Sequence, residues 1–254
     1  MPNTLFLEGE ILVGSYDQPL KFFGLDKIQQ TAFVLPDKNR LFNASDLITA
    51  ENNNFFMAFK LPLFKFMPSQ FDALYLAVGY KGQNILRDGG TYSYNSTAEN
   101  LDYFSGPASH NTVQFDGHLQ MPQLRQFLVD AWLKLCNLIY AKDKFSCGYA
   151  DVWGCQHQRQ ISLHHKDITV IDSMVGFKDS VVLRWRLQPG KWELNDKKNC
   201  NGAISIEIKT DNEVEIVLSS GFESRYYYQK TVLPVLEVKV KQSSTTITVI
   251  KDLS

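Results

Sequence analysis

Residues able to exchange protons or to bind carboxylates are concentrated in one stretch of this chain, from Asn84 to Gln120. The stretch begins NILRDGGTYSYN and, after a short spacer, continues YFSGPASHNTVQFDGHLQ. Histidine and tyrosine can act as acids and bases, while arginine and asparagine donate hydrogen bonds to anionic groups. Packing alone gives a β-rich domain no reason to gather such residues so densely. The stretch therefore predicts either a polar site or an elaborate set of turns.

The pattern around His110 is that of a short strand followed by a hairpin turn. The alternation puts His110, Thr112 and Gln114 on one face and Val113 and Phe115 on the other, and Asp116-Gly117 favours a tight turn. This alternation predicts that His110 lies on the polar face of the strand. A single strand histidine is more often a hydrogen-bonded polar residue than a catalytic one, so both interpretations stay open.

Two other groups of polar residues stand out. Arg87-Asp88-Gly89-Gly90 follows a short predicted strand, and its simplest interpretation is a turn in which Asp88 accepts backbone N–H groups. Further along, His157 and Arg159 share one face of a predicted strand with apolar residues. Burial of unpaired polar groups is costly, so this pair needs a partner, which could be a carboxylate or a metal ion.

The elements that must position these residues are mostly strands. In the last third of the chain, period-two alternation predicts strands at 181–187, 204–208, 214–218, 236–240 and 247–249, with turn residues between them. The first third is less regular, with an aromatic stretch at 55–66 and strands predicted at 72–77 and 84–86. The segment 128–139 fits helical and strand spacing equally well. We expect an all-β, antiparallel, supersandwich-like β-sandwich with few short helices, forming one domain over 1–254 to which 1–66 contribute the N-terminal strands.

Composition narrows the possible partners. The 254 residues are 44% hydrophobic and carry 26 Lys and Arg against 27 Asp and Glu, which favours neither nucleic acid nor a membrane surface as a partner. The first fifteen residues lack the pattern of a signal peptide, and no apolar run reaches transmembrane length. Four cysteines show no metal-ribbon spacing and are expected to be free thiols, with pairing of Cys147 and Cys155 as the alternative.

Several segments, in order, resemble one known family. NILRDGGTYSYN, then ASHNTVQFDG with the following QMP, then the His-x-Arg strand, VLRWRL and finally ESRYY with PVLEV are similar to the C-terminal domain of heparinase II/III-like polysaccharide lyases. The resemblance runs from about Pro68 to about Val240. It implies a β-sandwich that in the family follows an N-terminal α/α-toroid. No toroid is recognised in this chain, so we expect it to represent either an excised C-terminal portion or a stand-alone remnant of a longer protein.

The resemblance also implies a reaction and its residues. Family members cleave uronic-acid-containing polysaccharides by β-elimination, in which a base removes the C5 proton and an acid assists the leaving sugar. It assigns catalytic roles to His110, from the HNT segment, and to Tyr149. Substrate-binding candidates are Asn111, Arg87, Tyr92 and Arg159. The partners implied are an acidic polysaccharide and the toroid. Typical members are periplasmic or secreted, although this chain carries no targeting signal of its own.

A structural metal is a further implication of the resemblance, since several members bind one with two histidines and an aspartate. The matching residues here are His110 or a near neighbour, Asp130 and His157, and zinc is the expected ion. His110 cannot easily be both a ligand and a catalytic residue. The chain also departs from the family, with Tyr75, Ala77 and Gly79 where His, Asp and Trp are often found.

Three functions therefore remain open. The chain is expected to be the sandwich part of a lyase that is inactive without its toroid. The departures favour, as an alternative, a non-catalytic carbohydrate-binding or assembly module. A purely structural β-sandwich, with His110 and His157 only hydrogen-bonded, is the third.

Overall fold

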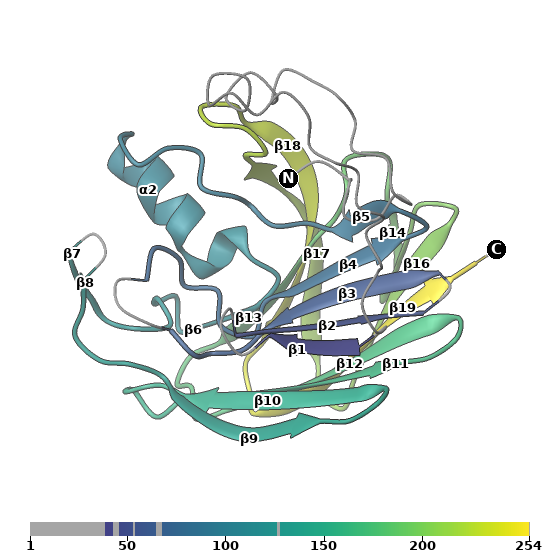
Figure 1. The fold of residues 1–254 in the computed structure, drawn as a ribbon, viewed down its shortest axis with the longest axis horizontal. Coiled ribbons are helices and arrows are strands. Elements are labelled where there is room, and N and C mark those ends of the chain that lie inside the picture. The colour runs from purple at the N-terminus through teal and green to yellow at the C-terminus, as the bar shows by residue number, and fades with distance from the viewer. Residues whose placement is uncertain (1–38, 43–45, 53, 65–67, 126–127, 254) are drawn as a thin grey trace, which may run out of the picture.

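The described part of the chain folds as an antiparallel β-sandwich that carries one short α-helix and one 3-10 turn (Figure 1). A computed structural model describes residues 39–42, 46–52, 54–64, 68–125 and 128–253. Every pairing of named strands in this part of the chain is antiparallel. The predicted fold class is confirmed. The strands expected within 1–38, and the N-terminal segment tested for a signal peptide, lie outside the described residues.

Two large sheets form the body of the sandwich. The first is five-stranded, in the order β1 (Asn39–Phe42), β2 (Leu47–Glu51), β3 (Phe55–Lys60), β4 (Leu76–Tyr80) and β5 (Gln83–Leu86). The second is eight-stranded, in the order β14 (Glu193–Asn195), β15 (Lys198–Cys200), β16 (Ile204–Thr210), β19 (Ser244–Asp252), β12 (Asp167–Val175), β11 (Gln156–Leu163), β10 (Lys144–Ala150) and β9 (Lys134–Tyr140). Strands β2, β3, β11 and β12 bury alternate residues, as half-buried strands should.

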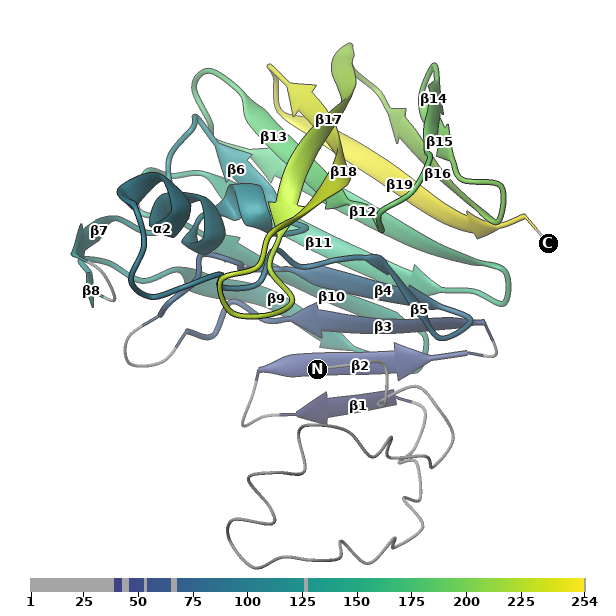
Figure 2. The same ribbon diagram turned by 90° about the horizontal axis from the view of Figure 1, so that it is seen from above.

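The remaining described strands form a four-stranded sheet and a two-stranded one. A four-stranded sheet has the order β17 (Val214–Glu223), β18 (Thr231–Val240), β13 (Val181–Arg186) and β6 (Val113–Phe115), and β7 (Gln123–Arg125) pairs with β8 (Leu128–Val129). The helix α2 (Ala98–Ser105) and the 3-10 turn η3 (Pro107–Ser109) lie at the same end as β7 and β8 (Figures 1 and 2). No helix in the described part of the chain is long and apolar enough to cross a lipid bilayer.

One hydrophobic core joins the three larger sheets. Fully buried Phe59 and Val78 come from the five-stranded sheet, Phe145 and Val170 from the eight-stranded sheet, and Trp185 from the four-stranded sheet. Figure 2 shows the five-stranded sheet stacked over the larger one. Burial of this shared apolar surface holds the loops between the sheets in fixed positions.

Local sequence explains where the structure differs from the predicted elements. The segment 128–139, left open between helix and strand, forms β8 and β9. The strand predicted at 72–77 begins only at Leu76, because Leu74 has a positive φ of 58° and the Tyr75 N–H bonds to the Asp72 carbonyl in a turn.

All four cysteines are free thiols, and burial raises the pKa of Cys147 to about 12.

Candidate active site

Two glycines bring the RDGG segment against the residues that precede β6. The Gly89 N–H donates to the Ser109 carbonyl at 2.8 Å, and a side chain at Gly89 would place its Cβ 2.6 Å from the Cβ of Ser109. Gly90 has a φ of 72°, and a Cβ there would lie 2.2 Å from the carbonyl oxygen of Ser224. Glycine is thus required at both positions, and the close approach places Asp88 beside His110.

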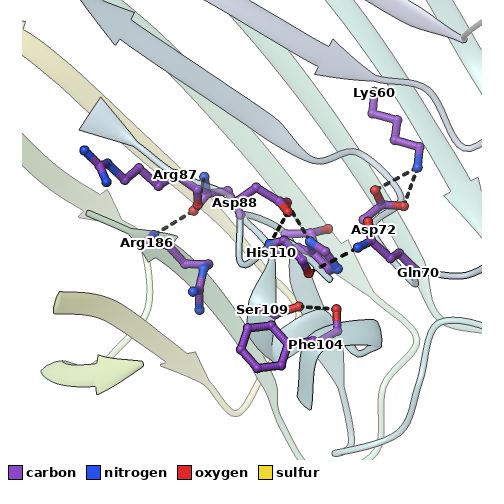
Figure 3. Close-up of polar contacts among 12 residues, drawn as sticks. Lys60, Gln70, Asp72, Arg87, Asp88, Phe104, Ser109, His110 and Arg186 are labelled. Carbon is purple, nitrogen blue, oxygen red and sulfur yellow. Dashed lines mark hydrogen bonds and ion pairs between the residues drawn. The ribbon is translucent and has the colours of Figure 1, made fainter. Parts of the chain in front are cut away.

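Asp88 and His110 form a hydrogen-bonded pair (Figure 3). His110 ends the η3 turn, and its side chain is fully buried, whereas the Asp88 side chain is 33% exposed. The Asp88 Oδ2 atom lies 2.7 Å from the His110 Nδ1, and Oδ1 accepts the Gly90 N–H at 2.7 Å. Although burial alone would raise the pKa of Asp88, its interactions with His110 and with the Gly90 N–H lower it below its usual value. Asp88 is therefore an ionised carboxylate that accepts a hydrogen bond from the Nδ1–H of His110.

The other ring nitrogen of His110 is left free for chemistry. With Nδ1 donating to Asp88, Nε2 carries a lone pair, and it is buried with no hydrogen-bond partner among the described residues. The ring of Tyr75 lies edge-on to His110, with centroids 6.2 Å apart. Burial, together with Asp88 and Asp72, raises the pKa of the Tyr75 hydroxyl well above its usual value. The site therefore offers an oriented histidine base beside a neutral phenol.

The prediction that His110 lies on the polar face of a strand is wrong. Strand β6 begins only at Val113, and His110 and Thr112 are both fully buried. Period-two alternation does not apply before β6, because His110 belongs to the end of a 3-10 turn whose first residue is Pro107. The side chain is buried because η3, the RDGG segment and Tyr75 surround it.

Asn111 and Arg87, both expected to bind substrate, bond to the protein itself. The buried Asn111 amide donates to the Leu76 and Arg87 carbonyls at 2.9 and 3.2 Å, and accepts the Arg186 N–H at 2.6 Å. Arg87 pairs with Glu223 at 2.6 Å while keeping 20% of its side chain exposed. Asn111 thus ties strands from two sheets together behind His110, and Arg87 remains partly accessible at the edge of the site.

Arg159 and His157 share a buried carboxylate. Asp172 accepts hydrogen bonds from Arg159 Nε at 2.7 Å, Arg159 Nη2 at 3.2 Å and His157 Nε2 at 2.6 Å, and all three side chains are fully buried. Arg159 also donates to the carbonyls of Leu74 and Asn111 at 2.6 and 2.8 Å. Of the two partners expected for this pair, the structure supplies the carboxylate. Through its bond to the Asn111 carbonyl, Arg159 consequently holds the backbone next to His110 in place.

The two tyrosines named from the resemblance, Tyr149 and Tyr92, differ in solvent exposure. Tyr149 is fully buried, Gln120 donates to its hydroxyl at 3.4 Å, and burial raises its pKa strongly, which disfavours the phenolate that a base requires. Tyr92 is partly exposed, stacks on Phe104 with centroids 5.4 Å apart, and has the Lys230 ammonium 4.7 Å from its ring centre. Tyr92 is accessible to a ligand as the chain is folded, and Tyr149 is not.

The metal ligand set expected from the resemblance is not assembled. His157 Nε2 already bonds to Asp172, His110 Nδ1 bonds to Asp88, and Asp130 is exposed beyond β8. Within the described residues, these three do not form a group whose ligand atoms lie near one another. The donors His110, Asp130 and His157 therefore do not fit one structural zinc ion in this chain.

Sequence reasoning missed the two aspartates that orient the histidines. The sequence predicts Asp88 as a turn residue, and one of its oxygens does accept the Gly90 N–H. Its other oxygen accepts a hydrogen bond from His110, which the sequence did not predict. Asp172 was not singled out, although it occupies a buried position in the apolar alternation of β12 and pairs directly with Arg159 in the strand register. A charged residue on the inward face of each of two successive strands was the available signal.

A recess with a volume of about 240 Å³ lies between α2 and β7. Its walls include Gln70, Thr91, Asp102, Phe104 and Arg125, from these two elements and the loops around them. Gln70 connects it to the RDGG segment by donating to the Gly90 carbonyl at 3.2 Å. The recess offers both polar groups and an aromatic edge, a combination suited to a sugar unit.

Comparison with known proteins relates the chain to one family and one fold. The family profile "Heparinase II/III-like, C-terminal" matches residues 36–247. A solved heparinase III superposes with a TM-score of 0.73 at 16% identity, covering 93% of this chain and 39% of the other. Heparan sulfate lyase HepC from Pedobacter heparinus gives 0.67 at 16% identity, covering 93% and 39%. A chondroitin AC lyase variant from Streptomyces coelicolor A3 gives 0.56 at 8% identity, covering 91% and 35%.

These solved structures are much longer than the chain. The chain spans between a third and two fifths of their length, and at these low identities the superpositions show a shared fold alone. A search of curated proteins found no match to the sequence.

Proposed function

The chain belongs to the heparinase II/III-like C-terminal family, and on that premise we propose that it is the β-sandwich part of a polysaccharide lyase. The substrate class is a uronic-acid-containing polysaccharide, cleaved by β-elimination. The observation that carries the proposal is the His110 ring, held by Asp88 through Nδ1 with Nε2 free. A histidine whose ring is oriented in this way is suited to act in proton transfer.

In the proposed reaction His110 handles one proton. The C5–H bond of the uronate breaks, a C4=C5 double bond forms, and the C4–O bond to the departing sugar breaks as its oxygen gains a proton. Nε2 of His110 accepts the C5 proton or, once protonated, returns one to the leaving oxygen. Asp88 stabilises the imidazolium formed between these events, because its carboxylate lies 2.7 Å from Nδ1.

A second domain is needed for this chemistry. The His110 side chain is fully buried within this chain, so substrate reaches Nε2 only when the segments that cover the ring move apart. The uronate carboxylate must also be neutralised in the transition state by hydrogen-bond donors. Asn111 and Arg159, which could have supplied them, are committed to the protein's own groups. We propose that a toroid domain supplies these donors.

The test compares the chain alone with the chain fused behind the toroid of heparinase III. Each is incubated with heparan sulfate, chondroitin sulfate and alginate, and ultraviolet absorbance of the unsaturated product is recorded. We expect no product from the chain alone and product from the fusion. His110→Gln should lower the turnover number of the fusion by at least about 100-fold, the usual contribution of a general acid or base.

A matched control is His165→Gln, which changes an exposed histidine. It should leave turnover unchanged. Product from the chain alone would overturn the need for a second domain. A folded, active fusion that tolerates His110→Gln would overturn the role of His110.

An exposed aromatic surface favours a second candidate, a carbohydrate-binding module. It consists of Tyr94, Phe222, Tyr226, Tyr227 and Tyr228, each between 43% and 59% exposed. Aromatic faces of this kind suit stacking against sugar rings, and Lys230 adds a positive charge 5.5 Å from the Phe222 ring centre. Affinity electrophoresis in gels containing each polysaccharide tests this function. Retardation lost on a Tyr226→Ala, Tyr227→Ala double change, but kept on Trp132→Ala, would support it, and absence of any retardation would exclude it.

A further inference from the structure

Three metal-binding side chains meet on the side of the sandwich where β6 turns towards the β10–β11 connection. They are Asp116, His118 and Cys155, and their ligand atoms all lie within 4.8 Å of one another. Asp116 and His118 belong to the turn after β6, in the four-stranded sheet, whereas Cys155 directly precedes β11 in the eight-stranded sheet. The group thus spans two sheets, and it shares no residue with the Asp88–His110 pair.

His118 is oriented as a metal-binding histidine is. Its Nδ1 atom lies 2.7 Å from the Leu119 carbonyl oxygen and donates to it, which leaves the lone pair on Nε2. Nε2 is buried and has no hydrogen-bond partner among the described residues. The ring lies against Trp153, with centroids 4.0 Å apart, so its orientation is restricted. Metal-binding histidines commonly donate their other ring N–H to a backbone carbonyl in this manner.

Carboxylates supply negative charge to the same place. Asp116 accepts three backbone N–H groups from 178–180, but its Oδ2 takes only one of them, from Lys178 at 2.9 Å, and keeps a lone pair. Asp151 stands next to the group, since its Oδ1 accepts the Cys155 N–H at 2.8 Å. Its second oxygen is buried without a hydrogen-bond partner in the described structure. A cation bound to this group would satisfy the orphan nitrogen of His118 and would lie in the field of the Asp151 carboxylate.

We propose that Asp116, His118 and Cys155 bind one divalent transition-metal ion of the zinc type. A donor set of sulfur, imidazole nitrogen and carboxylate oxygen favours zinc or cobalt over calcium or magnesium, which prefer oxygen alone. Tetrahedral zinc with bonds of about 2.0–2.3 Å places its ligands roughly 3.3–3.8 Å apart. Small side-chain movements therefore close the present group around an ion, and water or Asp151 completes it.

The ion would join the β6 turn to the loop before β11. These two segments already lie close to the β12–β13 connection, where Gly176 meets Gly154 so tightly that a Cβ on Gly176 would be 2.2 Å from the Gly154 carbonyl oxygen. A bond from each sheet to one ion stabilises the native arrangement of all three segments. The inference does not depend on lyase activity, so its success or failure leaves the proposed function untouched.

Cobalt titration of the whole chain, with any affinity tag removed, tests the proposal. We expect saturation at one Co²⁺ per chain, with a near-ultraviolet thiolate-to-cobalt band and visible bands of tetrahedral intensity that Zn²⁺ abolishes. Cys155→Ser should remove the thiolate band. His118→Gln should weaken binding by more than the roughly 10–100-fold that follows loss of a residue merely supporting a ligand. Cys136→Ser and His165→Gln serve as matched controls and should bind as the parent does.

Thermal unfolding gives a second measurement on the same proteins. Zinc at 100 times its dissociation constant should raise the melting temperature of the parent and the controls by about 5–11 °C, and should not do so for Cys155→Ser. Should a ligand variant fail to fold, titration of the parent still decides. No saturable binding by the parent, or a thiolate band that survives in folded Cys155→Ser, would overturn the proposal.

Discussion

The buried Asp172 carboxylate makes the sharpest stability prediction. It accepts one hydrogen bond from His157 and two from Arg159, and none of the three side chains is exposed. Burial by itself would raise the pKa of Asp172, but the Arg159 charge and the His157 bond outweigh burial and lower it. The carboxylate is thus ionised at neutral pH, and Arg159 has it as its counter-charge.

Asp172→Asn keeps the shape of the side chain and removes its charge. The Arg159 guanidinium is then buried without a counter-charge, and breaking a buried ion pair in this way costs about 3–5 kcal/mol. For a protein of this size each kcal/mol lowers the melting temperature by about 2–4 °C. We therefore expect the melting temperature to fall by about 6–20 °C, from these two ranges combined.

Chemical and thermal unfolding, followed by circular dichroism, measure this effect. The matched control is Glu237→Gln, because Arg184 pairs with Glu237 at 2.7 Å but the two side chains are 13% and 32% exposed. A partly exposed pair should cost no more than about 1 kcal/mol. If Asp172→Asn destabilises the protein no more than Glu237→Gln does, the buried ion pair between Asp172 and Arg159 does not contribute the free energy of unfolding expected of it.

Two more predictions concern His157 and Gly90. Burial lowers the pKa of His157 below its usual value, so the unfolded chain binds more protons than the folded one. The free energy of unfolding should therefore fall as pH drops from about 7.5 through 6.5 and on to the lower folded pKa. The urea midpoint of His157→Gln should depend less on pH over this range, and a pH dependence equal to that of the parent would contradict the account. Gly90→Ala should destabilise far more than Gly82→Ala, because both have positive φ but only Gly90 would place a Cβ 2.2 Å from a backbone oxygen, that of Ser224. Equal unfolding free energies for the two variants would refute that steric account.

Part of the fold was predictable because strands bury alternate residues. In β13, β16 and β19 the apolar residues recur at period two, and these strands lie where the alternation places them. The segment 128–139 could not be assigned, because Leu128 and Ile139 are both exposed and no buried face imposes a period. The start of β4 was also misplaced, since a turn at Leu74 with positive φ leaves no clear mark in an apolar sequence.

The candidate site was predictable to the level of its segments. The ordered motifs pointed to His110 and to the RDGG segment, and both lie at the site. Its contacts were not predictable, because Asp88 and His110 are 22 residues apart and meet only when glycine lets two backbones approach. The same holds for Asp116 and Cys155, which lie in loops next to strands of different sheets.

The sequence by itself determined the all-β class, most strands and the family, because these depend on local periodicity and on ordered motifs. Tertiary structure alone decided which polar residues are partners. It buried His110 against Asp88, gave Asp172 to both His157 and Arg159, and separated Asp130 from the ligands expected beside it. The physical reason is that hydrogen bonds and ion pairs depend on distances of about 3 Å between side chains, which only the stacking of the sheets sets.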